Sequence, residues 1–379
     1  MRFEPYPFEK LNALLAPLSP NPDLDPIVLT VGEPQFETPD FIQTAFCDAS
    51  AELKKYPKTA GEPELNAAMR GFVERRFGVT LSQEQLVSSF GTREVLFNFP
   101  QYLLADTDSP VTAFTNPFYQ IYEGAAIASG AKTHYLNLDE SNGFVPEADE
   151  AVLRECDLVI LNFPNNPTTA CLPSETLGRW VELALEHDFV LLNDECYSEI
   201  YPHDAPAGLL EAAKAVGNDD FRNVLVLNSI SKRSSAPGLR SGFIAGDARI
   251  LEGYRQYRTY VGCASPLPLQ RAATAAWNDD AHVEEARAVY RRNFELAREI
   301  LGTPVPEATF YLWLEVGDAI ETTRRLYRDY SVKVLPGEYL ARTDADGRNP
   351  GRGYIRIALV ERPERTEEAL KRIREALNG

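Results

Sequence analysis

The chain has 379 residues, with 44% hydrophobic and 25% charged side chains, a balance typical of a globular protein. Its formal net charge of −18 at pH 7 disfavours a nucleic-acid partner, because such proteins need a positive surface that displaces the counterions of the phosphate backbone. The longest apolar runs have the length of strands rather than the roughly 20 residues of a membrane span, and the N-terminus lacks a secretory-signal pattern, so we expect a cytoplasmic protein without a membrane partner.

Three parts are predicted along the chain, since its length exceeds what one small core organises. Residues 1–39 are expected to form an N-terminal arm that packs with the small domain, with a short helix in LNALLAPL and a short strand ending at Gly32. Residues 40–280 are predicted as a large domain and residues 281–379 as a smaller α+β domain, which a long helical pattern from Asp280 connects to the first. For Gly32, turn geometry and close backbone approach to a ligand are both open.

Strand-like and helical segments alternate through the predicted large domain. Helical patterns cover residues 40–52 and the stretch that starts at Pro63, and apolar strands such as DLVILNF and FVLLN then alternate with further helices. This rhythm predicts an α/β fold with a mostly parallel, doubly wound sheet.

Polar residues follow two of these strands. Gly91 and Thr92 come after the strand LVSS and begin a helix, whose free N–H groups and dipole favour an anion. Asp194 and Tyr197 follow FVLLN, at the edge where the carboxyl ends of parallel strands open onto a crevice. A helix cap at Thr92 and an ordinary strand-end carboxylate at Asp194 are the alternatives without a ligand.

A single lysine, Lys232, lies among small hydroxyl residues in the stretch NSISKRSSAPGLRSG. The strands VLVLN and GFIAGD flank this stretch, which places Lys232 in a loop at a strand end. Ligands of open α/β sheets bind at that edge, although an arbitrary loop lysine is more often an exposed charge.

Six motifs together resemble the class I/II aminotransferases, the fold-type I pyridoxal-phosphate enzymes, in order and spacing along nearly the whole chain. They are SISKRSSAPGLRSG, NDECY, NNPT, FGT, Tyr56 ahead of Gly61, and Arg356 in YIRIALV. The segments PYPFEKL, VGEPQFETPDFI, FGTRE and YRTYVG are most similar to the succinyldiaminopimelate aminotransferases. The resemblance implies a large domain with a mostly parallel doubly wound sheet, a smaller α+β C-terminal domain, and pyridoxal 5'-phosphate as cofactor.

The resemblance also implies roles for the residues around the cofactor ring. Lys232 would form the Schiff base and move the proton, and Asp194 would pair with the pyridine nitrogen. Tyr197 and Asn166 would hydrogen-bond the phenolic oxygen. Tyr119 would stack on the ring, with the neighbouring Phe118 as a competitor for this role.

For the phosphate, the resemblance implies a clamp made by Gly91, Thr92, Ser229 and Arg240. Tyr56 would reach the phosphate of a neighbouring subunit, so a homodimer is expected. No metal is implied, and five cysteines without a Cys-x-x-Cys spacing, beside only four histidines, are expected to be reduced thiols.

For the substrate, Arg356 would bind the α-carboxylate as a bidentate pair, with the Gly32 backbone and Asn166 nearby. The candidates for a distal carboxylate are the cations Arg93, Arg258 and Lys10. The family usually has glycine after Asn-Pro-Thr, where this chain has Thr169, so the turn is expected to differ or to be strained.

The function that the resemblance implies is transamination between an amino acid and a 2-oxo acid. The expected pair is N-succinyl-LL-2,6-diaminopimelate or glutamate with 2-oxoglutarate, in diaminopimelate and lysine biosynthesis. An aspartate or aromatic aminotransferase and a C–S lyase of the same fold are the alternatives. A pyridoxal-phosphate-binding transcription regulator is disfavoured by the negative charge and by a family match that begins within the first ten residues.

Overall fold

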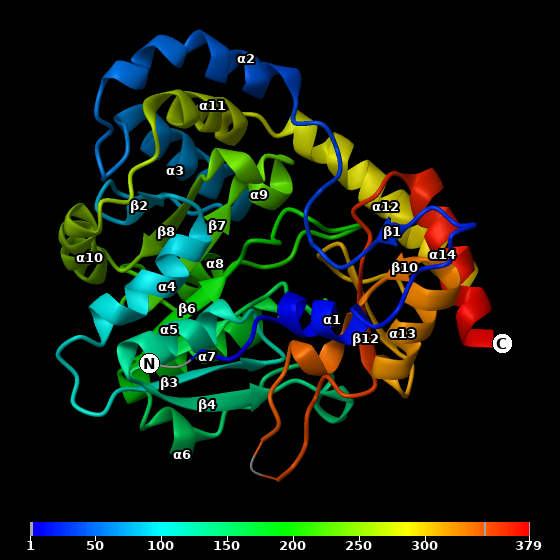
Figure 1. Cartoon of the computed structure of the whole chain (residues 1–379). Coiled ribbons are helices and arrows are strands. Elements are labelled where there is room, and N and C mark those ends of the chain that lie inside the picture. The colour runs from blue at the N-terminus through cyan, green and yellow to red at the C-terminus, as the bar shows by residue number, and fades with distance from the viewer. Residues whose placement is uncertain (1–2, 345, 379) are drawn as a thin grey trace.

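The structure is a computed structural model that describes residues 3–344 and 346–378. A seven-stranded sheet with the order β2-β8-β7-β6-β5-β3-β4 forms its centre (Figure 1). Strands β3 to β7 run parallel to one another, whereas β8 is antiparallel to both β7 and β2. The bounds are β2 Leu86–Ser89, β3 Val111–Asn116, β4 Lys132–Asn137, β5 Leu158–Leu161, β6 Val190–Asp194, β7 Val224–Ser229 and β8 Gly242–Gly246.

Helices cover both faces of this sheet because apolar residues occupy both faces of its central strands. On β7, Val224 and Val226 belong to one core cluster and Leu225 and Leu227 to another, as the alternation of side chains along a strand requires. The first cluster contains residues of α3 (Pro63–Phe77), α7 (Ser174–His187), α8 (Leu209–Ala215) and α11 (Leu267–Asn278). The second contains residues of α4 (Thr92–Leu103), α5 (Ile121–Ser129) and α10 (Ala248–Val261). The predicted α/β fold is confirmed.

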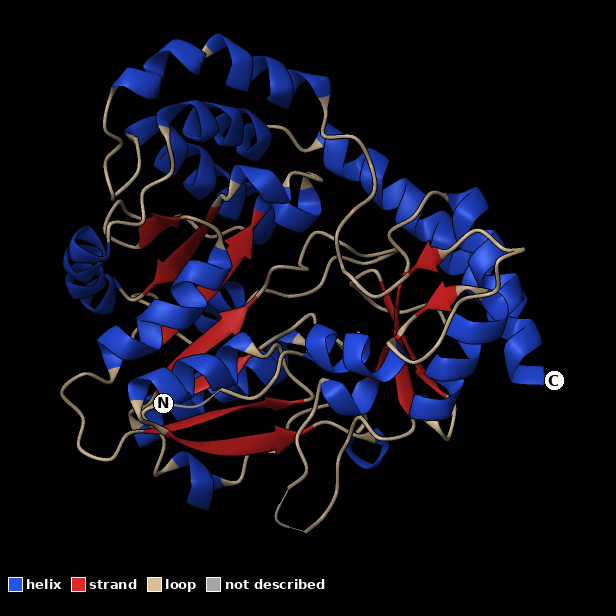
Figure 2. Cartoon of the chain, in the orientation of Figure 1, coloured by secondary structure: helices blue, strands red, loops and turns tan. Residues whose placement is uncertain are grey.

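The C-terminal part has its own core around a three-stranded antiparallel sheet, β11-β12-β9, which stands apart from the large sheet in Figure 2. The bounds are β9 Tyr311–Glu315, β11 Leu335–Pro336, β12 Tyr354–Ala358, α12 Ala281–Leu301, α13 Ala319–Tyr330 and α14 Pro363–Asn378. The long helix α12 leads from the helices of the large sheet to this second core (Figure 1).

The N-terminal segment contacts the C-terminal part. Leu11 and Leu15 of α1 (Pro7–Leu15) pack against Leu335 and Leu340, and β1 (Ile27–Val28) pairs in parallel with β10 (Val332–Lys333). None of the helices within the described residues is long and apolar enough to cross a membrane.

The structure corrects three local expectations. Helix α1 begins at Pro7 rather than within LNALL, since proline fits the first helical position, where no N–H bond is needed. The predicted helix 40–52 is divided into α2 (Asp40–Asp48) and a 3-10 turn at Ser50–Lys54. Lys232 lies in a helical turn, α9 (Ile230–Arg233), rather than in a loop, because the Ser229 side chain accepts a bond from the Ser231 N–H and caps that turn.

Candidate active site

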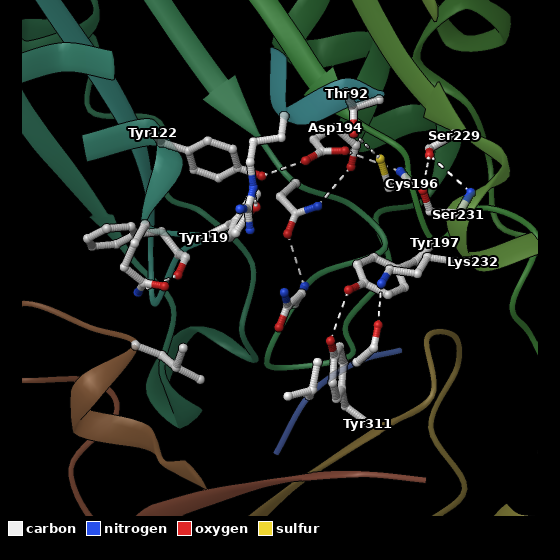
Figure 3. Close-up of a pocket in the computed structure, with 18 of the residues that line it drawn as sticks. Thr92, Tyr119, Tyr122, Asp194, Cys196, Tyr197, Ser229, Ser231, Lys232 and Tyr311 are labelled. Atoms are coloured by element: carbon white, nitrogen blue, oxygen red, sulfur yellow. Dashed lines mark hydrogen bonds between the residues drawn. The ribbon is translucent and has the colours of Figure 1, made fainter. Parts of the chain in front are cut away.

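A cavity of about 460 Å³ lies between the carboxyl edge of the large sheet and the C-terminal sheet. Asn162, Asp194 and Ser229 reach it from the ends of β5, β6 and β7, and Tyr311 and Arg356 reach it from β9 and β12. Ten of the predicted site residues line it, namely Gly32, Thr92, Tyr119, Asn166, Asp194, Tyr197, Ser229, Lys232, Arg240 and Arg356. Figure 3 shows Asp194, Tyr197, Ser229 and Lys232 on the same wall.

Asp194 ends β6 and is 4% exposed. Its carboxylate accepts hydrogen bonds from the Tyr122 hydroxyl at 2.8 Å and from the Cys196 N–H at 3.3 Å. Burial raises the pKa of Asp194, and no cationic side chain among the described residues pairs with it. A buried carboxylate that is oriented in this way suits a ligand that brings a protonated nitrogen.

Lys232 points into the cavity from α9, and its ammonium nitrogen donates a hydrogen bond to the Gly32 carbonyl (Figure 3). Burial lowers the pKa of Lys232 to about 8, and the positive charges of Arg356 and Arg93 act in the same direction. The neutral amine, which is the nucleophile and base, is therefore populated nearer to neutrality than in an exposed lysine.

Gly32 is explained by packing. A Cβ on this residue would overlap the Tyr311 hydroxyl, and Gly32 is not among the glycines with positive φ. A turn that requires glycine does not explain Gly32, since its φ is not positive, and close approach of its backbone to a ligand stays a prediction.

Donor groups for an anion gather where α4 begins. Thr92 is the first residue of α4, and Gly91 before it has a φ of 76°, a region that favours glycine. A Cβ on Gly91 would overlap the guanidinium of Arg240. Gly91 does not itself line the cavity, and it allows Arg240 to approach the helix N-terminus.

Arg240 and two serine hydroxyls complete this group of donors. Arg240 donates to the Pro237 carbonyl at 2.9 Å and, among the described residues, makes no ion pair. The hydroxyls of Ser229 and Ser231 lie 3.0 Å apart on the same side of the cavity (Figure 3). A guanidinium, hydroxyls and a helix N-terminus form a donor set that fits a phosphate dianion.

Arg356 stands on the central strand β12 and is 4% exposed. It donates to the Asn166 side-chain oxygen at 2.8 Å and to the Thr30 carbonyl at 2.7 Å, and it lies 4.4 Å from the centroid of the Tyr311 ring. Its Nε is buried without a hydrogen-bond partner. The guanidinium is thus held in place with bonding capacity left for a carboxylate.

Aromatic residues surround the remaining sides. The Tyr197 and Tyr311 hydroxyls are 3.0 Å apart, and burial raises the pKa of Tyr197. Tyr119 lies beside Arg93, whose Nε donates to the Tyr119 hydroxyl at 2.5 Å. Phe118 also lines the cavity, but its ring packs parallel to Tyr135 in the core, so the contacts favour Tyr119 as the residue free to face a ligand.

The three candidates for a distal carboxylate have different surroundings. Arg93 lines the cavity and, among the described residues, makes no ion pair. Arg258 is 1% exposed and grips both oxygens of Glu94 at 2.8 and 3.0 Å, outside the cavity lining. Lys10 is also outside the lining, 3.9 Å from Glu4. The proposal for Arg258 is wrong because its buried guanidinium is already paired with the Glu94 carboxylate.

Tyr56 is the predicted residue that the structure keeps apart from the others. Its side chain is fully exposed and does not line the cavity. Its predicted contact with a phosphate needs a second subunit and stays a prediction.

Sequence reasoning missed five residues that shape the site, namely Tyr122, Asn162, Cys196, Ser231 and Tyr311. Asn162 donates to the Asp194 carbonyl at 2.8 Å, and Cys196 lies 3.2 Å from the Thr92 hydroxyl. Tyr122 follows Tyr119 by nearly one helical turn, a spacing that could have indicated it. Tyr311 carries no local signal, since it reaches the site from the other sheet.

The turn at Thr169 is strained. Thr169 has a φ of 69°, and its N–H donates to the Asn165 carbonyl at 3.0 Å. The chain therefore keeps at this position a backbone conformation that suits glycine. Of the two expectations for this turn, a different conformation or a strained one, the structure shows the strained one.

The expectation of no metal cluster rested on the low histidine count. Away from the cavity, Glu150, Glu186 and His187 bring potential ligand atoms within 4.8 Å of one another. Arg154 and Arg179 lie 3.1 and 3.8 Å from the Glu150 carboxylate. We interpret this group as a network of surface ion pairs.

The sheet, the lysine at its carboxyl edge and the adjacent anion site define an α/β enzyme of the fold-type I class. The sequence matches the family described as Aminotransferase class I and II over residues 25–373. The chain therefore belongs to the class I/II aminotransferases, a family that implies a pyridoxal phosphate cofactor and amino-acid and oxo-acid substrates.

Solved structures and sequence relatives agree with this membership. Aminotransferase AspB from Helicobacter pylori 26695 is 48% identical with a TM-score of 0.97, and the match covers 100% of both chains. An aminotransferase from Neisseria meningitidis Z2491 is 38% identical with a TM-score of 0.93, over 98% of this chain and 97% of that one. An LL-diaminopimelate aminotransferase of Syntrophobacter fumaroxidans is 30% identical over 98% of this chain and 96% of that protein.

Proposed function

We propose that this aminotransferase moves an amino group between N-succinyl-LL-2,6-diaminopimelate and the pair glutamate and 2-oxoglutarate, in the cytoplasm, as a step of lysine biosynthesis. The observation that carries the substrate class is the pair of guanidinium groups in one cavity, at Arg356 and Arg93. A substrate with carboxylates at both ends can bind both cations. In a protein with a net charge of −18, local arginines must supply this attraction.

In this proposal Lys232, Asp194 and the phosphate clamp serve the bound cofactor, which supplies an electron sink for the carbanion at the substrate Cα. Asp194 keeps the ring nitrogen protonated, and Thr92, Ser229 and Arg240 hold the phosphate. The amine of Lys232 would take the proton from the substrate Cα and deliver it to the C4′ carbon of the cofactor. Tyr197 and Asn166 fix the orientation of the ring through its phenolic oxygen.

At the substrate end, Arg356 receives the α-carboxylate and thereby presents the Cα proton to Lys232. Asn166 contacts Arg356 at 2.8 Å, which links the cofactor side of the cavity to the substrate side. Arg93, held by Tyr119, receives the distal carboxylate. Tyr6, Pro7 and Phe8 of the N-terminal segment line the same mouth and provide surface for a longer substrate.

A second candidate function keeps the same chemistry with a smaller substrate. LL-diaminopimelate aminotransferases occur among the sequence relatives, and an aspartate aminotransferase from Thermotoga maritima is similar in structure with 25% identity and a TM-score of 0.85. A free cation at Arg93 also suits the side chain of aspartate or glutamate.

The experiment is a titration of the purified holoenzyme that follows the visible absorption of the bound cofactor. Glutamate and N-succinyl-LL-2,6-diaminopimelate should both convert it to the amino form, and 2-oxoglutarate should reverse the change. A response to aspartate or to LL-diaminopimelate, without one to the succinylated compound, would establish the second candidate. Release of pyruvate or a thiol from a cysteine-type substrate would instead indicate a C–S lyase.

A homodimer is part of the proposal. Leu53, Tyr56 and Tyr260 are 68%, 101% and 86% exposed, so these large side chains are available for contact with a second copy of the chain. A second copy would cover such residues and bring Tyr56 to a phosphate.

A further inference from the structure

The turn that carries Lys232 continues into two residues that leave the cavity. Arg233 and Ser234 are each 1% exposed, and neither lines the cavity. Arg233 contacts the short connection between α11 and α12, which contains Asp279 and Asp280, and Ser234 contacts His282 in the first turn of α12. The neighbours of Lys232 in sequence are therefore attached to the start of the long helix α12.

Ser234 is attached through a histidine. His282 Nε2 lies 2.9 Å from the Ser234 hydroxyl, and His282 Nδ1 lies 2.6 Å from an Asp279 carboxylate oxygen. The same oxygen accepts the His282 backbone N–H at 3.0 Å. An ionised Asp279 accepts from Nδ1–H, so Nε2 of a neutral ring accepts the Ser234 hydroxyl proton.

The charge states agree with this arrangement. The hydrogen bond from His282 lowers the pKa of Asp279, and burial lowers the pKa of His282. The ring is therefore neutral and the carboxylate ionised around neutral pH.

The same three residue types form the nucleophile, base and acid of many hydrolases, but a hydrolytic role does not fit here. Ser234 is 1% exposed, and none of the three lines the cavity, so a substrate carbonyl cannot reach the hydroxyl. What the three contacts can do is fix the position of the residue at the end of the Lys232 turn.

Arg233 makes a second attachment beside the first. It donates to the Ala276 carbonyl at 2.7 Å and to Asp280 at 2.7 Å, with its guanidinium 5.1 Å from the Phe72 ring centroid. Two consecutive residues after Lys232 are thus bound to the segment at which α12 begins.

Helix α12 then reaches the core that contains the substrate side of the site. Tyr290 and Phe294 of α12 pack in one cluster with Tyr311 of β9 and with Ile355 and Ile357, which flank Arg356 on β12. The helix therefore joins the two groups that must meet across the substrate, the lysine amine and the carboxylate-binding arginine.

We propose that Ser234, His282 and Asp279 form a positioning relay that fixes the Lys232 turn relative to α12, and so aligns the lysine amine with a substrate held by Arg356. The relay touches neither substrate nor cofactor, and its members are positioning residues. This inference rests on the role proposed for Lys232.

The test uses the holoenzyme with three variants. Ser234→Ala removes one hydroxyl, His282→Leu removes the ring contacts, and His282→Gln keeps a polar group near the Nε2 position. Steady-state rates are normalised to bound cofactor, and the primary isotope effect is measured with an α-deuterated amino-acid donor. Exposed His203 provides the matched control, His203→Leu.

With a relay, Ser234→Ala and His282→Leu should each lower kcat about tenfold, because a small misplacement of a proton-transfer group is costly, while KM for the donor changes less than about twofold. The isotope effect should increase, since proton transfer becomes slower than the other steps. His282→Gln should recover most of the rate, and a double variant that combines Ser234→Ala with His282→Leu should lose no more than the worse single variant.

Wild-type rate and isotope effect in both Ser234→Ala and His282→Leu would overturn the relay. So would a lower rate with an unchanged isotope effect, which would reflect fewer competent molecules. Lys232→Ala separates the two proposals, because turnover in that variant would refute the role of the lysine, whereas an inactive Lys232→Ala beside normal relay variants would refute the relay alone.

Discussion

At the residue scale, the chemistry depends on a lysine whose burial has changed its acidity. The pKa of Lys232 is lowered to about 8 from 10.5, and its neutral form increases as the pH rises through that value. We expect the rate at which the apoenzyme takes up pyridoxal phosphate to rise with pH and to level off above about 8. Stopped-flow absorbance measures this rate.

The control for this pH profile is Lys232→Ala, which should retain the phosphate clamp but show no covalent uptake. A wild-type rate that continues to rise to about pH 10 would mean that the amine has the pKa of an exposed lysine. That result would contradict the lowered pKa of Lys232 in a buried site.

The free guanidinium of Arg93 is expected to select substrates with two carboxylates. Arg93→Gln removes the charge, and KM for dicarboxylic donors should rise about tenfold or more, since a charge-assisted hydrogen bond contributes about 1.5–3 kcal/mol. The KM for a monocarboxylic donor such as alanine should not change.

Lys10→Gln is the matched control. Lys10 is a cation of the N-terminal segment, and it does not line the cavity. It should leave both KM values unchanged. An equal rise in both KM values for Arg93→Gln would assign Arg93 to the general shape of the pocket rather than to substrate selection.

At the scale of elements, the turn after β5 holds Asn166 at the expense of strain at Thr169. A β-branched residue at a φ of 69° costs about 1–2 kcal/mol, and glycine would return part of this through its greater freedom in the unfolded chain. We expect Thr169→Gly to raise the free energy of unfolding by about 1 kcal/mol, or Tm by about 1 °C at fixed protein concentration.

Thr169→Ala is the comparison for this turn, because it removes the β-branch but keeps a Cβ, and its gain should be smaller. A loss of stability in the glycine variant would show that the threonine side chain makes a contribution larger than the strain. Thermal unfolding of the holoenzyme, followed by circular dichroism, distinguishes the two results.

At the scale of the whole molecule, Tyr56 makes a prediction about two copies of the chain. A mixture of Tyr56→Ala and Lys232→Ala subunits, each nearly inactive alone, should recover about one quarter of the wild-type activity after reassembly. Half of the dimers are then hybrids, and one of the two sites in each hybrid has both native residues.

Recovery requires that Tyr56 acts on the site of the other subunit. If the mixture stays as inactive as its parents while size-exclusion chromatography shows hybrids, Tyr56 acts within its own chain or not at all. Unmixed samples taken through the same dissociation and reassembly are the control.

Much of the fold and the chemistry was accessible from the sequence because the signals are local. The alternation of strands and helices follows from short apolar patterns, and Asp194, Ser229 and Lys232 lie at ends of strands that those patterns locate. The parallel strands bring such ends to one edge, so residues far apart in the chain were expected together.

The tertiary structure decided what depends on distant partners. Arg93 lies in the segment FGTRE and Arg258 in YRTYVG, and only the contact of Arg258 with Glu94, 164 residues away in the chain, shows which guanidinium is free. Gly32 is required because Tyr311 packs against it. The relay from Ser234 to His282 likewise joins segments 48 residues apart. A local pattern carries no information on such pairs, because burial and packing assign each charge its partner only after the chain has folded.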